Sequence, residues 1–207
     1  MIRVVVATSN PGKIREFGAA LAGTGIETLG LDSLADRSPV EETGATFEEN
    51  ARIKAEAYSL RTDRTVLAED SGLEVDALGG EPGVMSARFG GADLDDPGRC
   101  RLVLHRLEGV ADGQRTARFH CVIAVARGGA TLATFHGVVE GRILHEARGE
   151  NGFGYDPIFF HPGIGRAFGE ITREEKQALS HRGRAVAAFV RAVKEGRLRV
   201  SRSSSAS

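Results

Sequence analysis

Two strand-like segments meet at a glycine pair in the middle of the chain, and this arrangement restricts the fold more than any other feature. In "RTARFHCVIAVARGG" apolar residues alternate at first and then become continuous, and "ATLATFHGVVEGRIL" follows directly. Two such segments on either side of Gly128 and Gly129 are typical of a β-hairpin. A hairpin places two antiparallel strands side by side, which favours a mixed sheet over an all-parallel one.

Helix-like segments alternate with strand-like segments around this hairpin. Short apolar runs at residues 2–7, in "IETLGL" and in the stretch that ends at Asp70 indicate strands. Apolar spacing and helix-start signals predict helices that begin near Lys13, Thr46, Asp96, Thr172 and Val186. Two of these starts, Thr46 and Thr172, stand three residues before a glutamate, which is the spacing of a capping box. The order of elements indicates an α/β fold.

The composition is that of an ordinary globular protein, with 207 residues, 41% hydrophobic and 27% charged. We expect one two-lobed domain over residues 1–198 and a polar, serine-rich, disordered tail over residues 199–207. The net charge of −1 gives no sign of a nucleic-acid partner. Because no apolar run reaches the ~20 residues of a membrane span or resembles a signal peptide, we expect a cytoplasmic protein without a membrane partner. Cys100 and Cys121 form no CxxC motif and are expected to be reduced thiols.

The loop "TSNPGK", between the first strand and the first helix, has the composition of an anion site. It places hydroxyl groups, an amide, backbone N–H groups and Lys13 before a helix start, where anions are stabilised. The GxxxxGK[ST] spacing is missing, which argues against a P-loop kinase. On its own, the loop fits a plain turn with a surface lysine equally well.

Glu69 and Asp70 directly follow an apolar run, "TVLA". Two adjacent carboxylates at the end of a buried strand need a positive partner, which can be a lysine, an arginine or a metal ion. Together with Glu42 they supply the hard oxygen ligands that Mg²⁺ prefers. The histidines and cysteines show no zinc spacing, so magnesium or manganese is favoured over zinc.

Two further segments carry side chains that suit a nucleoside. In "GENGFGYDPIFF" glycines permit close backbone approach, and Phe153 can stack on a base. "TREEKQALSHRG" offers Lys176, His181 and Arg182, and arginine with histidine can donate hydrogen bonds to a carbonyl oxygen. Taken singly, each segment also fits a structural role, as a tight turn or as a charged junction between helices.

The motifs, taken together and in order, are much more specific than any one of them. The segments are "ATSNPGKIREF", "EETGATFEENARIKA", "AEDSGLEVDALGGEPGVMSARF", "ARFHCVIA", "GFGYDPIFF" and "TREEKQALSHRG", and the matching region extends from Arg3 to about Val193. They resemble the inosine triphosphate pyrophosphatase family, also called the Ham1 or noncanonical purine NTP pyrophosphatase family. The resemblance implies an ITPase-like α/β fold, with a long mixed central sheet flanked by helices and two lobes with an active-site cleft between them.

The resemblance also implies an activity and a set of site residues. Family members hydrolyse ITP, dITP and XTP to the monophosphate and pyrophosphate with Mg²⁺, for which Mn²⁺ can substitute, and they are usually homodimers. Asp70 would be the catalytic acceptor, and the metal ligands would be Asp70, Glu42 and Glu69. The substrate would contact Thr8, Ser9, Asn10, Pro11, Gly12, Lys13, Asn50, Lys54, Ser71, Phe153, Gly154, Tyr155, Asp156, Lys176, His181 and Arg182. Of these, His181 and Arg182 are expected to read the 6-keto group of the purine.

Two other functions are weighed against this one. A pyrophosphatase of the related Maf group typically carries serine and arginines in its opening loop, and "TSNPGK" departs from that pattern. A nucleotide sensor without turnover would lack the acid cluster, whereas Glu42, Glu69 and Asp70 are all present.

Overall fold

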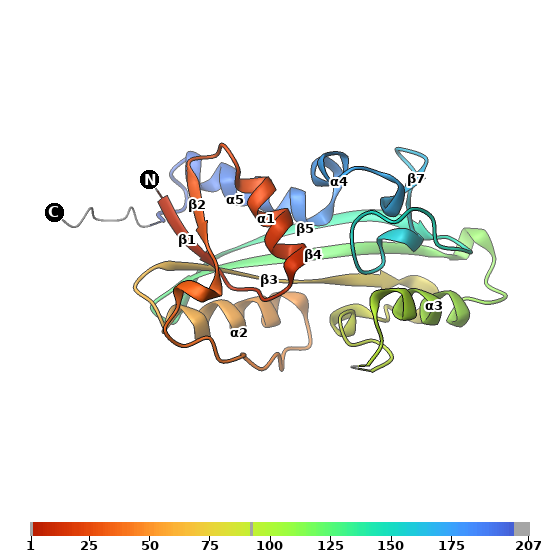
Figure 1. Cartoon of the computed structure of the whole chain (residues 1–207), viewed down its shortest axis with the longest axis horizontal. Coiled ribbons are helices and arrows are strands. Elements are labelled where there is room, and N and C mark those ends of the chain that lie inside the picture. Colours follow the sequence, from red (N-terminus) through yellow and green to blue (C-terminus); the bar gives the residue numbers. More distant parts are fainter. Residues whose placement is uncertain (1, 92, 201–207) are drawn as a thin grey trace. The chain divides into compact units, whose positions relative to one another are not determined.

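The computed structural model describes residues 2–91 and 93–200, and within them seven strands form one sheet in the order β2-β1-β3-β4-β5-β6-β7 (Figure 1). The strands are β1 Ile2–Val6, β2 Ile26–Leu29, β3 Thr65–Val75, β4 Thr116–Arg127, β5 Ala130–Ile143, β6 Phe159–His161 and β7 Arg166–Ala167. The α-helices are α1 Pro11–Leu21, α2 Phe47–Ser59, α3 Asp96–Arg106, α4 Arg173–Leu179 and α5 His181–Lys194. Short 3-10 helices occupy Leu31–Ser33, Asp76–Leu78, Gly83–Met85, Asp112–Gln114, Asp156–Ile158 and Phe168–Glu170.

The sheet is mixed, as predicted. Strand β1 pairs in parallel with β2 and β3, whereas β6 pairs antiparallel with β5 and β7. The central strands β4 and β5 are joined by a two-residue turn in which Gly128 and Gly129 have φ angles of 58° and 81°. Positive φ at both positions is characteristic of the tight turns of β-hairpins, so the hairpin prediction is confirmed.

Strand β3 is longer than the sequence indicated. The sequence predicts one strand that ends at Asp70 and another in the segment LEVDALGG, but β3 runs without interruption from Thr65 to Val75, so Glu69 and Asp70 lie in its interior. Aspartate and glycine have low strand propensity, and both Asp70 and Gly72 are in this strand. The pairing of β3 with β1 ends at Leu67, and the place of β3 beside β4 in the sheet overrides that local preference.

The described chain divides into two compact units, and β3, β4 and β5 each contribute to both. The first unit holds residues 2–70, 121–137 and 182–200, and the second holds residues 71–91, 93–120 and 138–181. Among the described residues, no helix combines the length and the apolar run that a bilayer crossing requires.

Helices α1 and α5 pack on a common core in the first unit. Phe17 of α1 and Phe189 of α5 are buried with Leu67 of β3. Val200 is buried in the same core, two residues beyond the predicted end of the domain. Residues 201–207 of the predicted tail lie outside the described residues.

Helix α2 lies on the other side of β3 from α5 (Figure 1). Its predicted capping box is present, because Thr46 accepts a hydrogen bond from the Glu49 N–H group and Glu49 accepts one from the Thr46 N–H group. The predicted apolar stripe is buried and consists of Phe47, Ala51, Ala55 and Tyr58.

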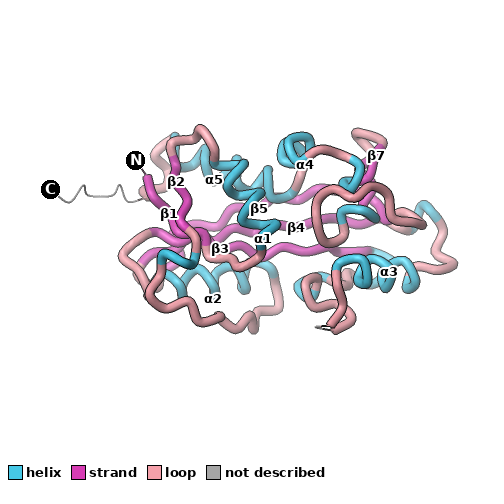
Figure 2. Tube along the Cα trace, viewed as in Figure 1, coloured by secondary structure: helices cyan, strands magenta, loops and turns pink. Residues whose placement is uncertain are grey.

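In the view of Figure 2, α4 is drawn above the long strands of the second unit and α3 below them. Val103 of α3 packs with Phe119, Phe159 and Phe168 in one buried cluster. The capping box predicted at Thr172 is present at the start of α4. Both cysteines of the chain are free thiols, as predicted, and both are buried.

Candidate functional site

Glu69 and Asp70 face opposite sides of β3, because successive side chains of a strand alternate between its two faces. Leu67, two positions before Glu69, belongs to the core beneath α1 and α5. Asp70 instead contacts Asn50 and Lys54 of α2. We expected the two carboxylates to share one metal ion, but the strand separates them and each has its own positive partner.

Glu69 is the centre of a buried ion-pair network. Arg182 donates to both of its oxygens, from Nε to Oε2 at 2.7 Å and from Nη2 to Oε1 at 2.9 Å, and Lys13 Nζ lies 2.8 Å from Oε1. Arg182 also binds Glu16, and the Cys121 thiol donates to Glu69 Oε2 at 3.1 Å. Burial acts to raise the pKa of Glu69, but Arg182 and Lys13 outweigh it and hold the pKa well below its usual range.

This network argues against two predicted roles. Glu69 is engaged by Arg182 and Lys13, which leaves it poorly placed to serve as a metal ligand. Arg182 was predicted to read the base, yet it is only 2% exposed and donates to Glu69 and Glu16. Glu16 and Cys121 were not among the predicted residues, because no local signal connects them to Glu69.

Asp70 has weaker partners than Glu69. Asn50 Nδ2 donates to Oδ2 at 3.2 Å, and Lys54 Nζ lies 3.5 Å from Oδ1 and 3.0 Å from Glu42 Oε1. Burial raises the pKa of Asp70, and the nearby charge of Glu42 raises it further. The positive charges of Lys54 and Lys13 lower the pKa only in part, so the net shift is upward. A carboxylate whose pKa is raised toward neutrality is suited to general-base chemistry.

Gly44 orients the side chain of Asn50 and was not among the predicted residues. Its N–H group donates to Asn50 Oδ1 at 2.8 Å, which directs the Asn50 NH₂ group toward Asp70. A Cβ atom at residue 44 would lie 2.8 Å from Asn50 Oδ1 and 2.6 Å from Glu49 Cβ. Only glycine fits this close approach, and the sequence signal is a glycine two residues before the Thr46 capping box.

Glu42 and Asp70 are the acidic pair that suits Mg²⁺. Both carboxylates face the Lys54 ammonium group, so they already converge on one positive charge. Proteins usually hold Mg²⁺ with one or two carboxylates, water and phosphate oxygens, which fits this pair. Within residues 2–91 and 93–200 no group of three or more Asp, Glu, His or Cys is arranged for a metal ion, so the predicted trio with Glu69 does not form there.

The loop before α1 caps its own helix. Asn10 Oδ1 accepts hydrogen bonds from the N–H groups of Gly12 at 2.8 Å and Lys13 at 3.1 Å. Thr8 Oγ1 accepts one from the Asn10 N–H group at 3.2 Å. Most N–H groups that were predicted to hold phosphate are therefore satisfied within the loop. The exposed residues of the loop are Ser9, Asn10 and Pro11.

Phe153, Asp156 and Lys176 meet in the second unit, as their predicted common role requires. Lys176 Nζ lies 2.5 Å from Asp156 Oδ2 and 4.7 Å from the centre of the Phe153 ring. Asp156 Oδ2 also accepts a hydrogen bond from the Phe153 N–H group at 2.9 Å. Lys176 and Asp156 are 4% and 1% exposed, so this ion pair is shielded from water. Their contact with a nucleoside remains a prediction.

Tyr155 and Gly152 support the same loop. The buried Tyr155 hydroxyl donates to the Ser86 carbonyl oxygen at 2.8 Å, which indicates an anchoring role rather than the predicted substrate contact. Gly152 has a φ of 79°, and a Cβ atom there would lie 2.0 Å from Asp156 Oδ2. Any other residue at position 152 would displace the Asp156 carboxylate.

His181 stacks on Phe119, with ring centroids 4.8 Å apart and an angle of 14° between the rings. Phe119 in turn contacts Phe159, at 4.5 Å between centroids. The orientation of the His181 imidazole is thus set by an aromatic wall that the sequence reasoning did not identify. Ser71, the remaining predicted residue, follows Asp70 on β3 and is half-buried.

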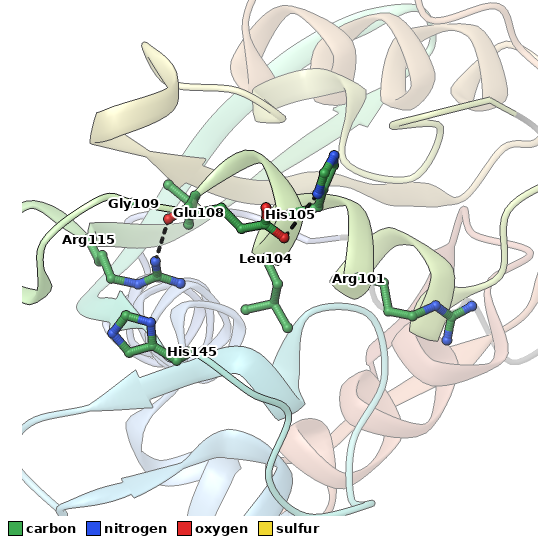
Figure 3. Close-up of a pocket in the computed structure, with 8 residues that line it drawn as sticks. Arg101, Leu104, His105, Glu108, Gly109, Arg115 and His145 are labelled. Carbon is green, nitrogen blue, oxygen red and sulfur yellow. Dashed lines mark hydrogen bonds and ion pairs between the residues drawn. The ribbon is translucent and has the colours of Figure 1, made fainter.

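A cavity of about 350 Å³ at the C-terminal end of α3 contains none of the predicted residues. Its lining consists of Arg101, Leu104, His105, Leu107, Glu108, Gly109, Arg115 and His145 (Figure 3). Arg115 is buried, and it donates to the backbone carbonyl oxygens of Ile143, Leu107 and Leu144. These bonds give Arg115 a structural role, in which it satisfies carbonyl groups where α3 and β5 end.

At neutral pH, Asp70→Asn is expected to unfold at a higher urea concentration than the wild type. The folded-state pKa of Asp70 lies above its reference value of 3.8, so ionisation is disfavoured in the folded protein relative to the unfolded chain. The resulting destabilisation is absent below pH 3.8, grows as the pH rises from there to the folded-state pKa and is complete above that pKa. Urea midpoints of both proteins at acidic and neutral pH, in the presence of a metal chelator, measure the difference. A variant less stable than the wild type at neutral pH would contradict the raised pKa.

Comparison with known proteins places the chain among relatives of one family. The model of the Ham1 family matches residues 4–192. A dITP/XTP pyrophosphatase of Geobacillus kaustophilus is 50% identical over 186 residues, which cover 90% of this chain and 91% of the relative. The structure of a HAM1 protein from Coxiella burnetii has a TM-score of 0.84 and 42% identity, covering 94% of this chain and 100% of its own. The Staphylococcus aureus Ham1 protein has a TM-score of 0.83 and 39% identity, with 95% and 100% covered.

Proposed function

Because the chain belongs to the Ham1 family, we propose that it hydrolyses noncanonical purine nucleoside triphosphates. The substrates are ITP, dITP and XTP, the products are the nucleoside monophosphate and pyrophosphate, and the reaction removes deaminated purines from the nucleotide pool. The observation that carries this proposal is the environment of Asp70. It is a buried carboxylate with a raised pKa, bound by Asn50 and Lys54, in a chain 50% identical to a dITP/XTP pyrophosphatase.

Asp70 orients the attacking water and takes its proton in the proposed reaction. Its raised pKa brings the carboxylate closer to the pH at which it works, which favours proton transfer. Asn50 and Lys54 hold the carboxylate from α2, and Gly44 keeps Asn50 in the donating orientation. Lys13 and Lys54 supply positive charge for the phosphate oxygens of the substrate.

The cofactor proposed for this site is Mg²⁺, with Mn²⁺ as a substitute, held by Glu42 and Asp70. When bound, it neutralises charge on the phosphate oxygens. Glu69 is left out of this ligand set because Arg182 and Lys13 already engage it. We also propose that the enzyme is a homodimer, as the family resemblance implies, and that it is cytoplasmic, as expected from its sequence.

The base is assigned to the second unit, where Phe153 would stack on the purine and His181 would donate to its 6-keto oxygen. The buried pair of Lys176 and Asp156 lies directly beside Phe153 and supplies further polar groups. Adenine carries a 6-amino group, which would oppose the donor and leave it unpaired. Arg182 was predicted to share this role with His181, but its bonds to Glu69 and Glu16 favour a structural role.

Hydrolysis of ITP in ¹⁸O-labelled water is expected to yield inosine monophosphate and pyrophosphate together, with the label only in the monophosphate. The reason is that Asp70 would direct water to the α-phosphorus, so the new oxygen stays with the nucleoside. Mass spectrometry of both products measures the label, and ATP and GTP serve as comparison substrates. Label in pyrophosphate would mean attack at the β-phosphorus and a wrong placement of Asp70. Inosine diphosphate and inorganic phosphate as first products would exclude a pyrophosphatase.

A further inference from the structure

The loop at residues 151–156 carries Phe153 and Asp156 but contains two glycines with positive φ. Gly152 and Gly154 have φ angles of 79° and 62°. Glycine loses more conformational freedom on folding than any other residue, so such a loop is ordered only where other groups bind it. Within the loop, the bond from the Phe153 N–H group to Asp156 supplies part of that order.

Helix α3 binds the backbone of Gly154 at two points. The Gly154 N–H group donates to Asp96 Oδ2 at 2.7 Å, and the Cys100 thiol donates to the Gly154 carbonyl oxygen at 3.3 Å. Asp96 and Cys100 are four residues apart in α3, which places them on the same helix face. One face of α3 therefore supplies both the acceptor for the Gly154 N–H group and the donor for the Gly154 carbonyl oxygen.

The chemistry of both side chains suits such a contact. The bond to Asp96 is charge-assisted, and such bonds are about twice as strong as neutral ones. Arg99 Nη1 lies 3.6 Å from Asp96 Oδ1 and balances its charge. Burial raises the pKa of Cys100 to about 12, so its thiol stays protonated and can donate.

We propose that Asp96 and Cys100 are positioning residues that hold Gly154 and thereby place Phe153 and Asp156 against Lys176. We call these two bonds to Gly154 the α3 clamp. The inference rests on the proposed function, in which this loop binds the purine. Without the clamp, the loop has to be ordered at the moment of binding, which lowers affinity for the base and leaves the chemical step at Asp70 largely intact.

Asp96→Ala is expected to raise KM for ITP about tenfold, because one charge-assisted hydrogen bond is lost, while kcat stays within about threefold. Asp96→Asn is expected to restore KM, because its amide oxygen can accept the same hydrogen bond. Asp95→Ala is the matched control, since Asp95 caps α3 by accepting from the Gly98 N–H group at 2.7 Å. It should lower the Tm and leave KM unchanged.

A fluorescence measurement tests the clamp without activity. The chain contains no tryptophan, so Phe153→Trp creates a single tryptophan in the loop, and its emission can be excited at wavelengths that tyrosine does not absorb. In that background, Asp96→Ala is expected to raise the acrylamide quenching constant about twofold or more, because the loop becomes more mobile. Asp95→Ala and Asp96→Asn should match the Phe153→Trp protein.

The α3 clamp is overturned if Asp96→Ala leaves both KM and quenching at the wild-type level, or if Asp95→Ala changes them equally. Should Asp96→Ala fail to fold, Cys100→Ala replaces it and Cys100→Ser, which keeps a donor, serves as its control. Cys100→Ala should then raise both KM and the quenching constant, and Cys100→Ser should raise neither. A wild type that does not hydrolyse ITP would overturn the proposed function, and the quenching comparison would still decide the clamp.

Discussion

Asp70→Asn is expected to lower kcat for ITP hydrolysis by at least about 10²-fold, within the ~10²–10⁴-fold range typical of the loss of a general base. The amide preserves the shape of the side chain but removes its charge and its basicity. Because Asn50 and Lys54 also contact Gly44 and Glu42, the surrounding side chains retain partners in the variant. Pyrophosphate release measures turnover, and a nucleotide-dependent rise in Tm reports binding.

Asp76→Asn is the matched control for this experiment. Asp76 directly follows β3 and binds Arg118 and Thr116, so it carries the same functional group in a structural role. Its kcat is expected to stay within about threefold of the wild type, as for substitutions away from a catalytic site. Near-normal turnover by Asp70→Asn would mean that another group is the base.

Glu69→Gln is expected to lower the free energy of unfolding by about 3–5 kcal/mol, because it removes one acid of a buried ion-pair network that also holds Arg182 and Lys13. Arg182 is 2% exposed and makes two hydrogen bonds to Glu69, so in the variant Glu16 alone would balance its buried charge. A loss of this size is a large part of the roughly 5–15 kcal/mol that stabilises a typical domain. Urea unfolding at neutral pH measures it.

Glu27→Gln provides the comparison for Glu69→Gln. The Arg3–Glu27 pair has an N–O distance of 2.8 Å, but its side chains are 48% and 37% exposed. Exposed pairs contribute about 0–1 kcal/mol, so this variant should remain close to the wild type. Equal losses in the two variants would show that burial does not decide the strength of the Glu69 network.

The effect of Glu69→Gln should also depend on pH. The folded-state pKa of Glu69 lies well below its reference value of 4.5, so ionised Glu69 stabilises the fold fully above pH 4.5. That contribution is lost as the pH falls through the folded-state pKa. The difference between wild type and variant should therefore be largest at neutral pH and shrink in acid, opposite in sign to the effect of Asp70.

The sequence predicted structure well where near neighbours decide it. Both capping boxes formed because the groups that meet are only three residues apart. The hairpin formed at Gly128 and Gly129 because two glycines can adopt the positive φ angles of a tight turn. The acids, Lys13 and the aromatic loop of the candidate site were singled out from local motifs, whereas Asn50 and Lys54 were added by the family resemblance, and the roles of all of them remain predictions.

Contacts between distant segments could not be predicted in the same way. Glu69 and Arg182 are 113 residues apart, and nothing near either residue indicates that they pair. The continuation of β3 beyond Asp70 depends on its neighbours in the sheet rather than on its own residues. Because Glu69 and Asp70 both lie inside β3, their side chains face opposite sides of the strand. The two carboxylates therefore meet different partners.

The self-capped start of α1 makes Asn10 an internal competitor for anions. A phosphate group that takes the N–H groups of Gly12 and Lys13 has to displace the Asn10 amide oxygen, so it gains only the difference between two sets of hydrogen bonds. A small anion with little else to offer gains almost nothing by this exchange. A triphosphate also brings several negative charges to Lys13 and Lys54. The more negative charge a ligand carries, the more readily it should displace the Asn10 amide oxygen.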